Sequence, residues 1–174
     1  MRATASASAP VARASSSGWP ILIDVERAAA AVPGLRVGSP GIDGLRRAEM
    51  GTWSGTVRLL DVDEDEHAVT YELRGRRTKP AGTAYVLVGA RLESRPDGCR
   101  VDVELSITAP ISVADVTSYA RSLTVALAQV LEAEALAQEP ALAQPAPGAY
   151  RIWPALLGIA AIIWVVRRIR AGAR

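Results

Sequence analysis

Few residues in this 174-residue chain could act as acids, bases, nucleophiles or metal ligands, and those few lie apart in the sequence. The single histidine, His67, follows the acidic run Asp63–Glu66, where a solvated turn residue is expected rather than a general base. The single cysteine, Cys99, follows the turn-like segment Arg95–Gly98 (RPDG) and excludes both an intramolecular disulfide and a multi-thiolate metal site. We therefore expect a partly buried thiol without a reactive role.

Two charged runs are the other candidates for chemistry. Asp61–Glu66 (DVDEDE) has the composition of a calcium loop but lacks its glycine and its terminal glutamate, so it predicts a hairpin turn. Arg74–Lys79 (RGRRTK) predicts a solvated basic loop, with an acidic protein or a phospholipid as the alternative partner. Phosphate-binding loops, metal-ligand clusters and nucleophile motifs are missing from the sequence. The sequence favours a binding or tethering module, with no catalytic residue and no metal.

Four segments alternate apolar and polar residues as half-buried strands do. They are Gly55–Val62, His67–Arg74, Thr83–Glu93 and Arg100–Thr108. Acidic and Pro-Asp-Gly turns and the basic loop at residues 75–82 connect them. Short connections between consecutive strands predict an antiparallel meander with one buried face.

A long helix is predicted from Val113 to about Gln138, with Ser112 as its N-cap and Asp115 in its first turn. Its apolar residues recur every three or four positions and form one stripe: Val116, Ala120, Leu123, Leu127, Val130 and Leu131. The stripe needs the apolar sheet face as its partner. A filled core and a lined cavity between the two remain open alternatives.

The N-terminal third carries weaker signals. Residues 19–32 predict one or two short helices that end at Pro33-Gly34. Residues 35–53 contain four glycines and a proline and predict a loop with one weak strand near residues 44–53. The proline-containing segment after the long helix predicts a linker. The expected organisation is a domain at 1–138, a linker at 139–150 and a tail at 151–174.

The tail combines an apolar run with positive charge. It carries five of the 20 basic residues and no acid, which leaves residues 1–150 with 15 basic against 18 acidic residues. The alkaline character therefore belongs to the tail and indicates an anionic lipid surface rather than nucleic acid. The first 18 residues lack the apolar core of a secretory signal, so we expect the domain on the cytoplasmic side of the cell membrane.

Residues 152–166 form a run of fifteen without charge, about 22 Å long as a helix and short of the ~30 Å hydrocarbon core. Tryptophans near both ends suit the lipid–water interface, and flanking arginines can extend the reach. The predicted membrane residues are Ile152, Trp153, Leu156, Leu157, Ile159, Ile162, Ile163, Trp164, Val165, Val166, Arg167 and Arg168. The apolar character slightly favours spanning, whereas the length and the terminal arginines favour shallow insertion.

The order of these features resembles the CoxG family of carbon monoxide dehydrogenase subunits, within the START/SRPBCC superfamily of polyketide-cyclase-like proteins. The resemblance covers residues 3–137. It rests on DVERAAAAVPGL at 24–35, SGTVRLLDVDEDEHAVTYELRGR at 54–76, GTAYVLVGARLE at 82–93, a DGCRVDVELSI strand and the long helix. Residues 24–34 (D-V-E-R-x-A-A-x-V-P-G) form the best motif, and SAPV at 8–11 fits the end of a first strand.

The resemblance implies an α+β helix-grip fold: an antiparallel sheet around a long C-terminal helix, with an apolar cavity between them. Candidate cavity residues are Leu59, Val69, Tyr71, Leu73, Val86, Val88, Val103, Leu105, Leu123 and Leu127. The implied function is a membrane-tethered carrier of menaquinone or another apolar ligand, or a recruitment factor for a molybdenum hydroxylase of the carbon monoxide dehydrogenase type. The alternatives are a cyclase or hydrolase using Tyr71, and a structural tether with a filled core.

Two segments depart from the family pattern. Residues 15–18 (SSSG) stand where an apolar first helix would begin. Between Pro33-Gly34 and Ser54-Gly55 the family has room for two strands, whereas this sequence predicts scarcely one. We therefore expect a sheet short of one strand, with its cavity opened on one side or lost.

Overall fold

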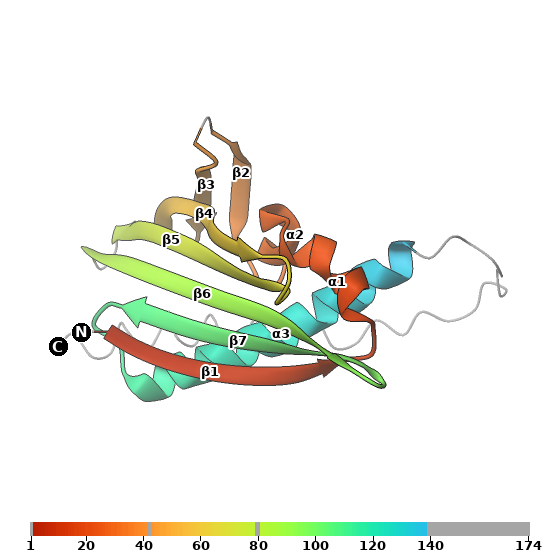
Figure 1. The fold of residues 1–174 in the computed structure, drawn as a ribbon. Coiled ribbons are helices and arrows are strands. Elements are labelled where there is room, and N and C mark those ends of the chain that lie inside the picture. The colour runs from red at the N-terminus through yellow and green to blue at the C-terminus, as the bar shows by residue number, and fades with distance from the viewer. Residues whose placement is uncertain (1, 42, 79–80, 139–174) are drawn as a thin grey trace, which may run out of the picture.

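A computed structural model describes residues 2–41, 43–78 and 81–138 as one antiparallel sheet packed against helices (Figure 1). The strands are β1 (Arg2–Val11), β2 (Arg36–Pro40), β3 (Arg46–Met50), β4 (Trp53–Asp63), β5 (Ala68–Thr78), β6 (Ala81–Arg95) and β7 (Gly98–Thr108). The helices are α1 (Ser15–Leu22), α2 (Val25–Ala29) and α3 (Val113–Gln138). The predicted linker at 139–150 and tail at 151–174 lie outside the described residues. Within the described ranges, no helix is long and apolar enough to cross a membrane.

The described strands form a seven-stranded sheet in the order β1-β7-β6-β5-β4-β3-β2. The meander from β2 to β7 runs in sequence order, and β1 pairs with β7 along its whole length, from Arg2↔Thr108 to Val11↔Cys99. Because directly paired residues share a face, the register defines an inner face that carries Val101, Val103 and Leu105 toward α3. The opposite, outer face carries the charged residues of the same strands.

The four predicted strands are confirmed, and all four are longer than expected. The predicted basic loop at 75–82 is wrong, because β5 continues to Thr78 and β6 begins at Ala81. Gly75 pairs with Ala84 and Arg77 with Gly82, so the backbone is satisfied by the ladder. The arginines are compatible with a strand because the pairing places Arg74 and Arg76 on the outer face.

Residues 35–53 form two strands, β2 and β3, where one weak strand was predicted. Glycines caused this error, because Gly44 and Gly51 have positive φ angles of 74° and 57° and serve turns rather than a long loop. These tight reversals leave room for two five-residue strands. The prediction of a shortened sheet is therefore also wrong.

The one or two short helices predicted at 19–32 are two helices, and α1 already starts at Ser15, within the SSSG segment whose composition is not typical of a helix. Small residues are needed there because α1 packs closely on the core. A Cβ atom at Gly18 would lie 3.1 Å from Leu92 Cδ1 and 3.3 Å from Leu131 Cδ2. Ser15 is buried, and its hydroxyl lies 2.7 Å from that of Ser94. Asp24 caps α2, because its carboxylate accepts hydrogen bonds from the backbone amides of Glu26 and Arg27.

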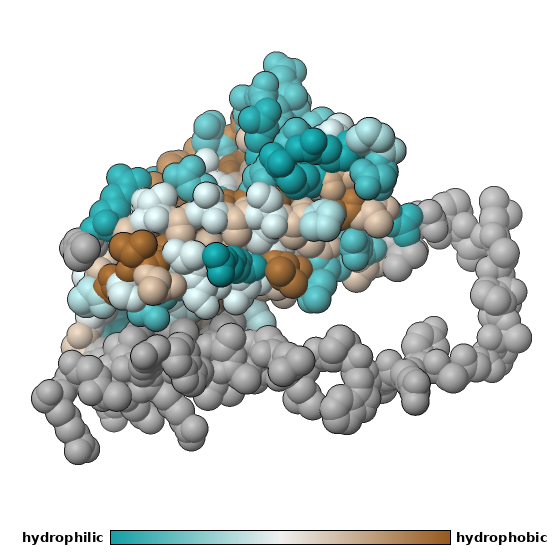
Figure 2. Space-filling view, turned by 90° about the horizontal axis from the view of Figure 1, so that it is seen from below, coloured by the Kyte–Doolittle hydropathy of each residue, from teal (hydrophilic) through white to brown (hydrophobic). Residues whose placement is uncertain are grey.

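Helix α3 has the predicted bounds and the predicted cap. The Asp115 amide donates to Ser112 Oγ at 3.1 Å, and Ser112 Oγ lies 2.6 Å from Asp115 Oδ2. The helix packs mainly along β1 and β7 (Figure 1). Seen from below, the uncovered part of the surface shows separate apolar patches among polar residues (Figure 2). The main apolar stripe of α3 faces the sheet, since Val116, Ala120 and Leu131 are buried, whereas Val113 and Val125 are half exposed.

Candidate functional site

The candidate cavity residues all lie on the inner face of the sheet or on the sheet-facing side of α3, but they differ in burial. The fully buried ones are Val69, Tyr71, Val103, Leu105 and Leu127. The half-buried ones are Leu59, Leu73, Val86, Val88 and Leu123. The sequence thus places these residues on one surface, but only the structure shows which of them are buried and which are half-buried.

The end of the inner face nearest α1 is completely packed. We call it the closed half, formed by Ile21, Leu22, Tyr71, Leu92, Val101 and Leu131. Ile21, Leu22, Val101 and Leu131 have no exposed surface. The Tyr71 hydroxyl donates a hydrogen bond to the Leu22 carbonyl, which fastens the end of α1 to β5. This half is a filled core.

The other end of the inner face is covered less completely. We call it the open half, formed by Trp53, Leu73, Val86, Val88, Ile107 and Tyr119. These side chains are half-buried, although the strands that carry most of them are central in the sheet. Helix α3 lies along β1 and β7 and does not extend over β4 and β5, and α1 meets β5 at Tyr71, in the closed half. The open half is therefore the candidate binding surface.

Two polar side chains stand at the edge of the open half. Arg77 pairs with Trp53 and Gly82 in the sheet, which places it on the inner face, and its Nε donates to Thr52 Oγ1 at 3.3 Å. On α3, burial and then the Asp115 carboxylate raise the pKa of Tyr119 to about 12, and the Arg77 charge opposes this rise. At neutral pH the edge thus combines a guanidinium and a neutral phenol, which are both hydrogen-bond donors for an oxygen-bearing group.

The sequence contains signals for both polar residues, although neither was predicted. Arg77 continues the inward alternation of Val69, Tyr71 and Leu73, but ending the predicted strand at Arg74 hid it. Tyr119 lies three residues after Val116 and four before Leu123, so the helical stripe could have included it.

Tyr71 was the candidate for the cyclase or hydrolase alternative. Its side chain is 7% exposed, and burial, followed by the nearby Asp24 charge, raises its pKa. Its hydroxyl already donates a hydrogen bond to the Leu22 carbonyl. Tyr71 therefore acts as a buried core residue and is poorly placed as a proton donor to a ligand.

The other chemical candidates lie away from the open half. His67 is in the predicted turn but is half-buried rather than solvated, because its ring meets the Trp19 ring edge-on with centroids 5.2 Å apart. Cys99 is a buried free thiol whose pKa is raised by burial. It lines a pocket of about 400 Å³ beside Arg95, Asp97 and Glu132, which contains none of the predicted cavity residues.

A buried carboxylate lies on the outer face. Glu72 is 4% exposed and accepts hydrogen bonds from Arg74 and Arg58, both at 2.7 Å, and from Tyr85 at 2.9 Å. The Arg74 bond is the main cause that holds the Glu72 pKa below its usual value. Because all three donors saturate the carboxylate on a solvent-facing surface, this cluster stabilises β4, β5 and β6 rather than forming a reaction site.

The chain matches no protein-family model and no curated protein. Its architecture, in contrast, matches solved structures. Norcoclaurine synthase from Thalictrum flavum, in complex with dopamine and hydroxybenzaldehyde, has a TM-score of 0.58 at 10% identity and covers 80% of this chain and 90% of its own. The ZhuI aromatase/cyclase from Streptomyces sp. R1128 has a TM-score of 0.54 at 17% identity and covers 81% and 98%.

A START superfamily protein from Mycobacterium smegmatis gives a similar result, with a TM-score of 0.56 at 16% identity over 77% of this chain and 97% of that one. At these identities the likeness concerns the fold alone, and the finer resemblance to the CoxG family stays a prediction. The chain therefore has the helix-grip fold of the START and polyketide-cyclase-like proteins.

Proposed function

We propose that this chain is a membrane-tethered carrier, which binds an apolar molecule with a polar oxygen-bearing end against the open half of the sheet. One observation carries the proposal: the named side chains of the closed half are buried, whereas Leu73, Val86 and Ile107 of the open half are half-buried. Leu73 and Val86 pair with each other on adjacent strands, and Val86 pairs with Ile107. Together they present a continuous apolar strip that a ligand can shield from water.

The polar edge supports the same proposal. A ligand with a carbonyl or an anionic oxygen at one end would place its apolar body over Leu73 and Val86 and its oxygen toward Arg77 and Tyr119. Ligand sites commonly combine an apolar lining with a few polar groups that fix orientation. A quinone has this chemistry, and menaquinone is our proposed ligand.

The tether and the partner complete the proposal. The apolar run at 152–166 with its flanking arginines supports attachment to the cell membrane, where an insoluble quinone resides. We propose that the domain stands on the cytoplasmic side and serves a molybdenum hydroxylase of the carbon monoxide dehydrogenase type. The sequence resemblance supports that partner. The cyclase or hydrolase alternative finds no support in Tyr71, whose hydroxyl is engaged.

The test is to identify what the full-length protein binds. Protein extracted in mild detergent is analysed by mass spectrometry for bound quinones and lipids and is then mixed with menaquinone-containing vesicles. Val86→Phe fills the open half, whereas Leu87→Phe alters the neighbouring residue on the outer face of the same strand. We expect Val86→Phe to reduce bound menaquinone at least several-fold and Leu87→Phe to leave it unchanged.

The same experiment separates the alternatives. Arg77→Gln and Tyr119→Phe should weaken binding of menaquinone more than binding of a hydrocarbon that lacks oxygen. If no apolar molecule binds to the wild-type protein, the carrier proposal fails and a structural tether with a filled core takes its place. If Val86→Phe binds as much menaquinone as wild type, the ligand does not occupy the open half.

A further inference from the structure

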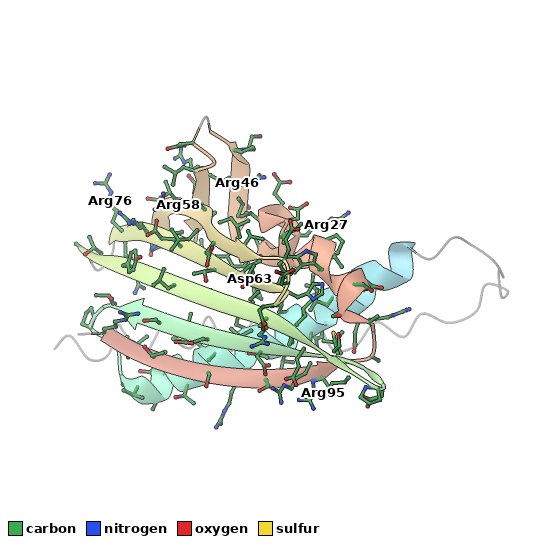
Figure 3. The ribbon with its side chains drawn as sticks, viewed as in Figure 1. Arg27, Arg46, Arg58, Asp63, Arg76 and Arg95 are labelled. Atoms are coloured by element: carbon green, nitrogen blue, oxygen red, sulfur yellow. The ribbon has the colours of Figure 1, made fainter. Side chains whose placement is uncertain are left out.

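The balance of charge differs between the two ends of the sheet. One end contains the start of β1 and β2, the end of β5 and the start of β6, and we call it the basic end. Its basic residues are Arg2, Arg36, Arg47, Arg74, Arg76 and Arg77. The opposite, acidic end carries the β4–β5 turn with Asp61, Asp63, Glu64, Asp65 and Glu66. Figure 3 shows Arg76 at one end of the sheet and Asp63 and Arg95 toward the other.

The register explains how arginines far apart in sequence share one end. Arg47 pairs with Thr56, which pairs with Arg74, and this outer-face row continues through Tyr85 and Thr108 to Arg2. The adjacent row begins at Arg36 on β2 and reaches Arg76 on β5. Among the described residues of these two rows, Glu49 is the only one with a carboxylate. The basic end is therefore a continuous surface.

The arginines of this surface are available to a partner. Arg76 is exposed, and no carboxylate of the described residues lies within salt-bridge distance of it. The Arg47 side chain is 79% exposed and pairs with Glu49 at 2.8 Å, whereas that of Arg74 is 61% exposed and pairs with Glu72. At the acidic end, Arg91 bridges to Glu66 and Arg95 to Glu93, and the other carboxylates of the β4–β5 turn add negative charge.

We propose that the basic end docks on an anionic phospholipid surface and turns the open half toward the membrane. The charge complementarity favours lipid because the same molecule carries an apolar, arginine-flanked tail. The acidic run at the opposite end is repelled by the same surface, which selects one orientation. Each arginine near an anionic bilayer changes the docked population by about five-fold. Docking requires only the membrane and does not depend on the proposed ligand.

The position of the open half gives this orientation a consequence. Trp53 and Arg77 pair with each other on the inner face at the basic end. An apolar molecule that leaves the bilayer would therefore meet the open half without crossing the acidic end. The chain is long enough for this orientation. Helix α3 is about 39 Å long. The roughly 12 residues at 139–150 can span at most about 40 Å, which is about the length of that helix. The tail can therefore reach a membrane at either end of the domain.

The test uses full-length protein on vesicles and measures which end of the domain meets the lipid. In a Cys99→Ala background, an environment-sensitive probe is attached at Gly82→Cys on the basic end or at Asp97→Cys on the acidic end. An added Cβ at Gly82 meets nothing within 4 Å, so the substitution is sterically tolerated. Vesicles contain either phosphatidylcholine alone or a mixture with phosphatidylserine, and brominated lipids quench probes that approach the bilayer.

We expect phosphatidylserine to increase quenching at residue 82 but not at residue 97, and 0.5 M salt to reverse the increase. The double variant Arg47→Glu/Arg76→Glu should lower the ratio of docked to undocked protein at least about 20-fold. The matched variant Arg91→Glu/Arg95→Glu, at the acidic end, should leave it unchanged. Thermal unfolding confirms that both variants fold, and vesicle flotation reports anchoring separately.

Two outcomes would overturn the proposal. Equal quenching at residues 82 and 97 would show that the domain has no preferred orientation on the lipid. The second outcome is a probe at residue 82 that is not quenched on phosphatidylserine vesicles, although flotation shows that the protein is anchored. It would show that the basic end faces solvent or a protein instead of the lipid. Neither outcome affects menaquinone binding in detergent, so the carrier proposal and the docking proposal fail independently.

Discussion

The closed and open halves of the inner face belong to one sheet and are built from similar residues, but they are packed differently. In the closed half, Ile21 and Leu22 of α1 and Leu131 of α3 meet Val101 without leaving exposed surface. In the open half, Leu73, Val86 and Val88 remain half-buried. The difference comes from the helices, because α1 and the second half of α3 cover one end only. Apolar character therefore does not distinguish a core from a binding surface here.

The largest expected effect is the loss of a core side chain from the closed half. Leu131→Ala leaves a void where α1, α3 and β6 converge at Gly18 and Leu92, and it should lower the free energy of unfolding by about 2–5 kcal/mol. Leu73→Ala removes the same number of carbon atoms from the open half, where water or a ligand can enter. It should cost about 1 kcal/mol in the ligand-free protein.

Urea unfolding of detergent-solubilised full-length protein, followed by far-UV circular dichroism, measures both values. Similar costs for the two leucines would erase the distinction between the halves and favour a filled core throughout. Added menaquinone should widen the difference between wild type and Leu73→Ala, because ligand binding stabilises the folded state.

A glycine substitution tests whether the strands of the open half can move apart or are tightly paired beneath an incomplete layer of side chains. A Cβ atom at Gly55 would lie 2.1 Å from the Arg74 carbonyl oxygen, so Gly55→Ala must separate β4 from β5. We expect a loss of about 3 kcal/mol, at the upper range for overpacking. Gly82→Ala, with open space around its Cβ, is the control and should change stability by less than about 0.5 kcal/mol.

The same unfolding assay distinguishes the two possibilities. A small effect of Gly55→Ala would mean that the strands of the open half adjust easily. The close approach of Trp53 to Gly75, whose Cβ would lie 2.3 Å from the indole, argues for a tight backbone beneath an incomplete layer of side chains.

Substitutions that enlarge a side chain should also affect the stability of the two halves differently. Val101 has no exposed surface, so Val101→Leu should cost about 1–3 kcal/mol through strain. Val86→Leu extends into the open half and should be neutral within about 0.5 kcal/mol. Thermal shift assays on the two variants give this comparison. An equal loss at both positions would show that no free volume exists beside Val86.

The sequence predicted the sheet-and-helix layout because strand and helix periodicities were strong in residues 55–138. Leu105 and Val116 illustrate this success, since each lies on the face that its periodicity indicated. The predictions failed where glycines carried conflicting signals. Gly44 and Gly51 lie in turns between strands, and Gly18 permits close helix packing. The composition of the segments that contain these glycines suggested loops instead.

The site was harder to predict than the fold, because burial depends on which helix lies over which strand. Alternation placed Leu73 and Val103 on the same face but could not distinguish a half-buried from a buried side chain. Arg77 and Tyr119 come from segments more than 40 residues apart. Only the sheet register and the path of α3 bring their charges close enough to interact.

The smallest expected effect concerns one hydroxyl in each half. Tyr71→Phe leaves the buried Leu22 carbonyl without its donor and should cost about 1 kcal/mol at neutral pH. Tyr119→Phe removes a half-buried hydroxyl and should be near neutral for stability. The pair therefore tests whether the closed half depends on satisfied polar groups as well as on apolar packing. Denaturant unfolding at pH 7.5 measures both effects.

Alkaline pH tests the burial of both phenols. Burial raises the pKa of Tyr71 and raises that of Tyr119 to about 12. The unfolded chain loses its phenol protons from about pH 10, while the folded protein retains them, so stability is fully present below that pH and declines as pH rises toward the folded pKa values. Tyr71→Phe and Tyr119→Phe should each make this decline shallower than in wild type, and by similar amounts between pH 8 and 11, because both folded phenols stay protonated there. An unchanged decline in Tyr119→Phe, measured by unfolding over that range, would show that this phenol titrates as in the unfolded chain and would contradict its half-buried position in the open half.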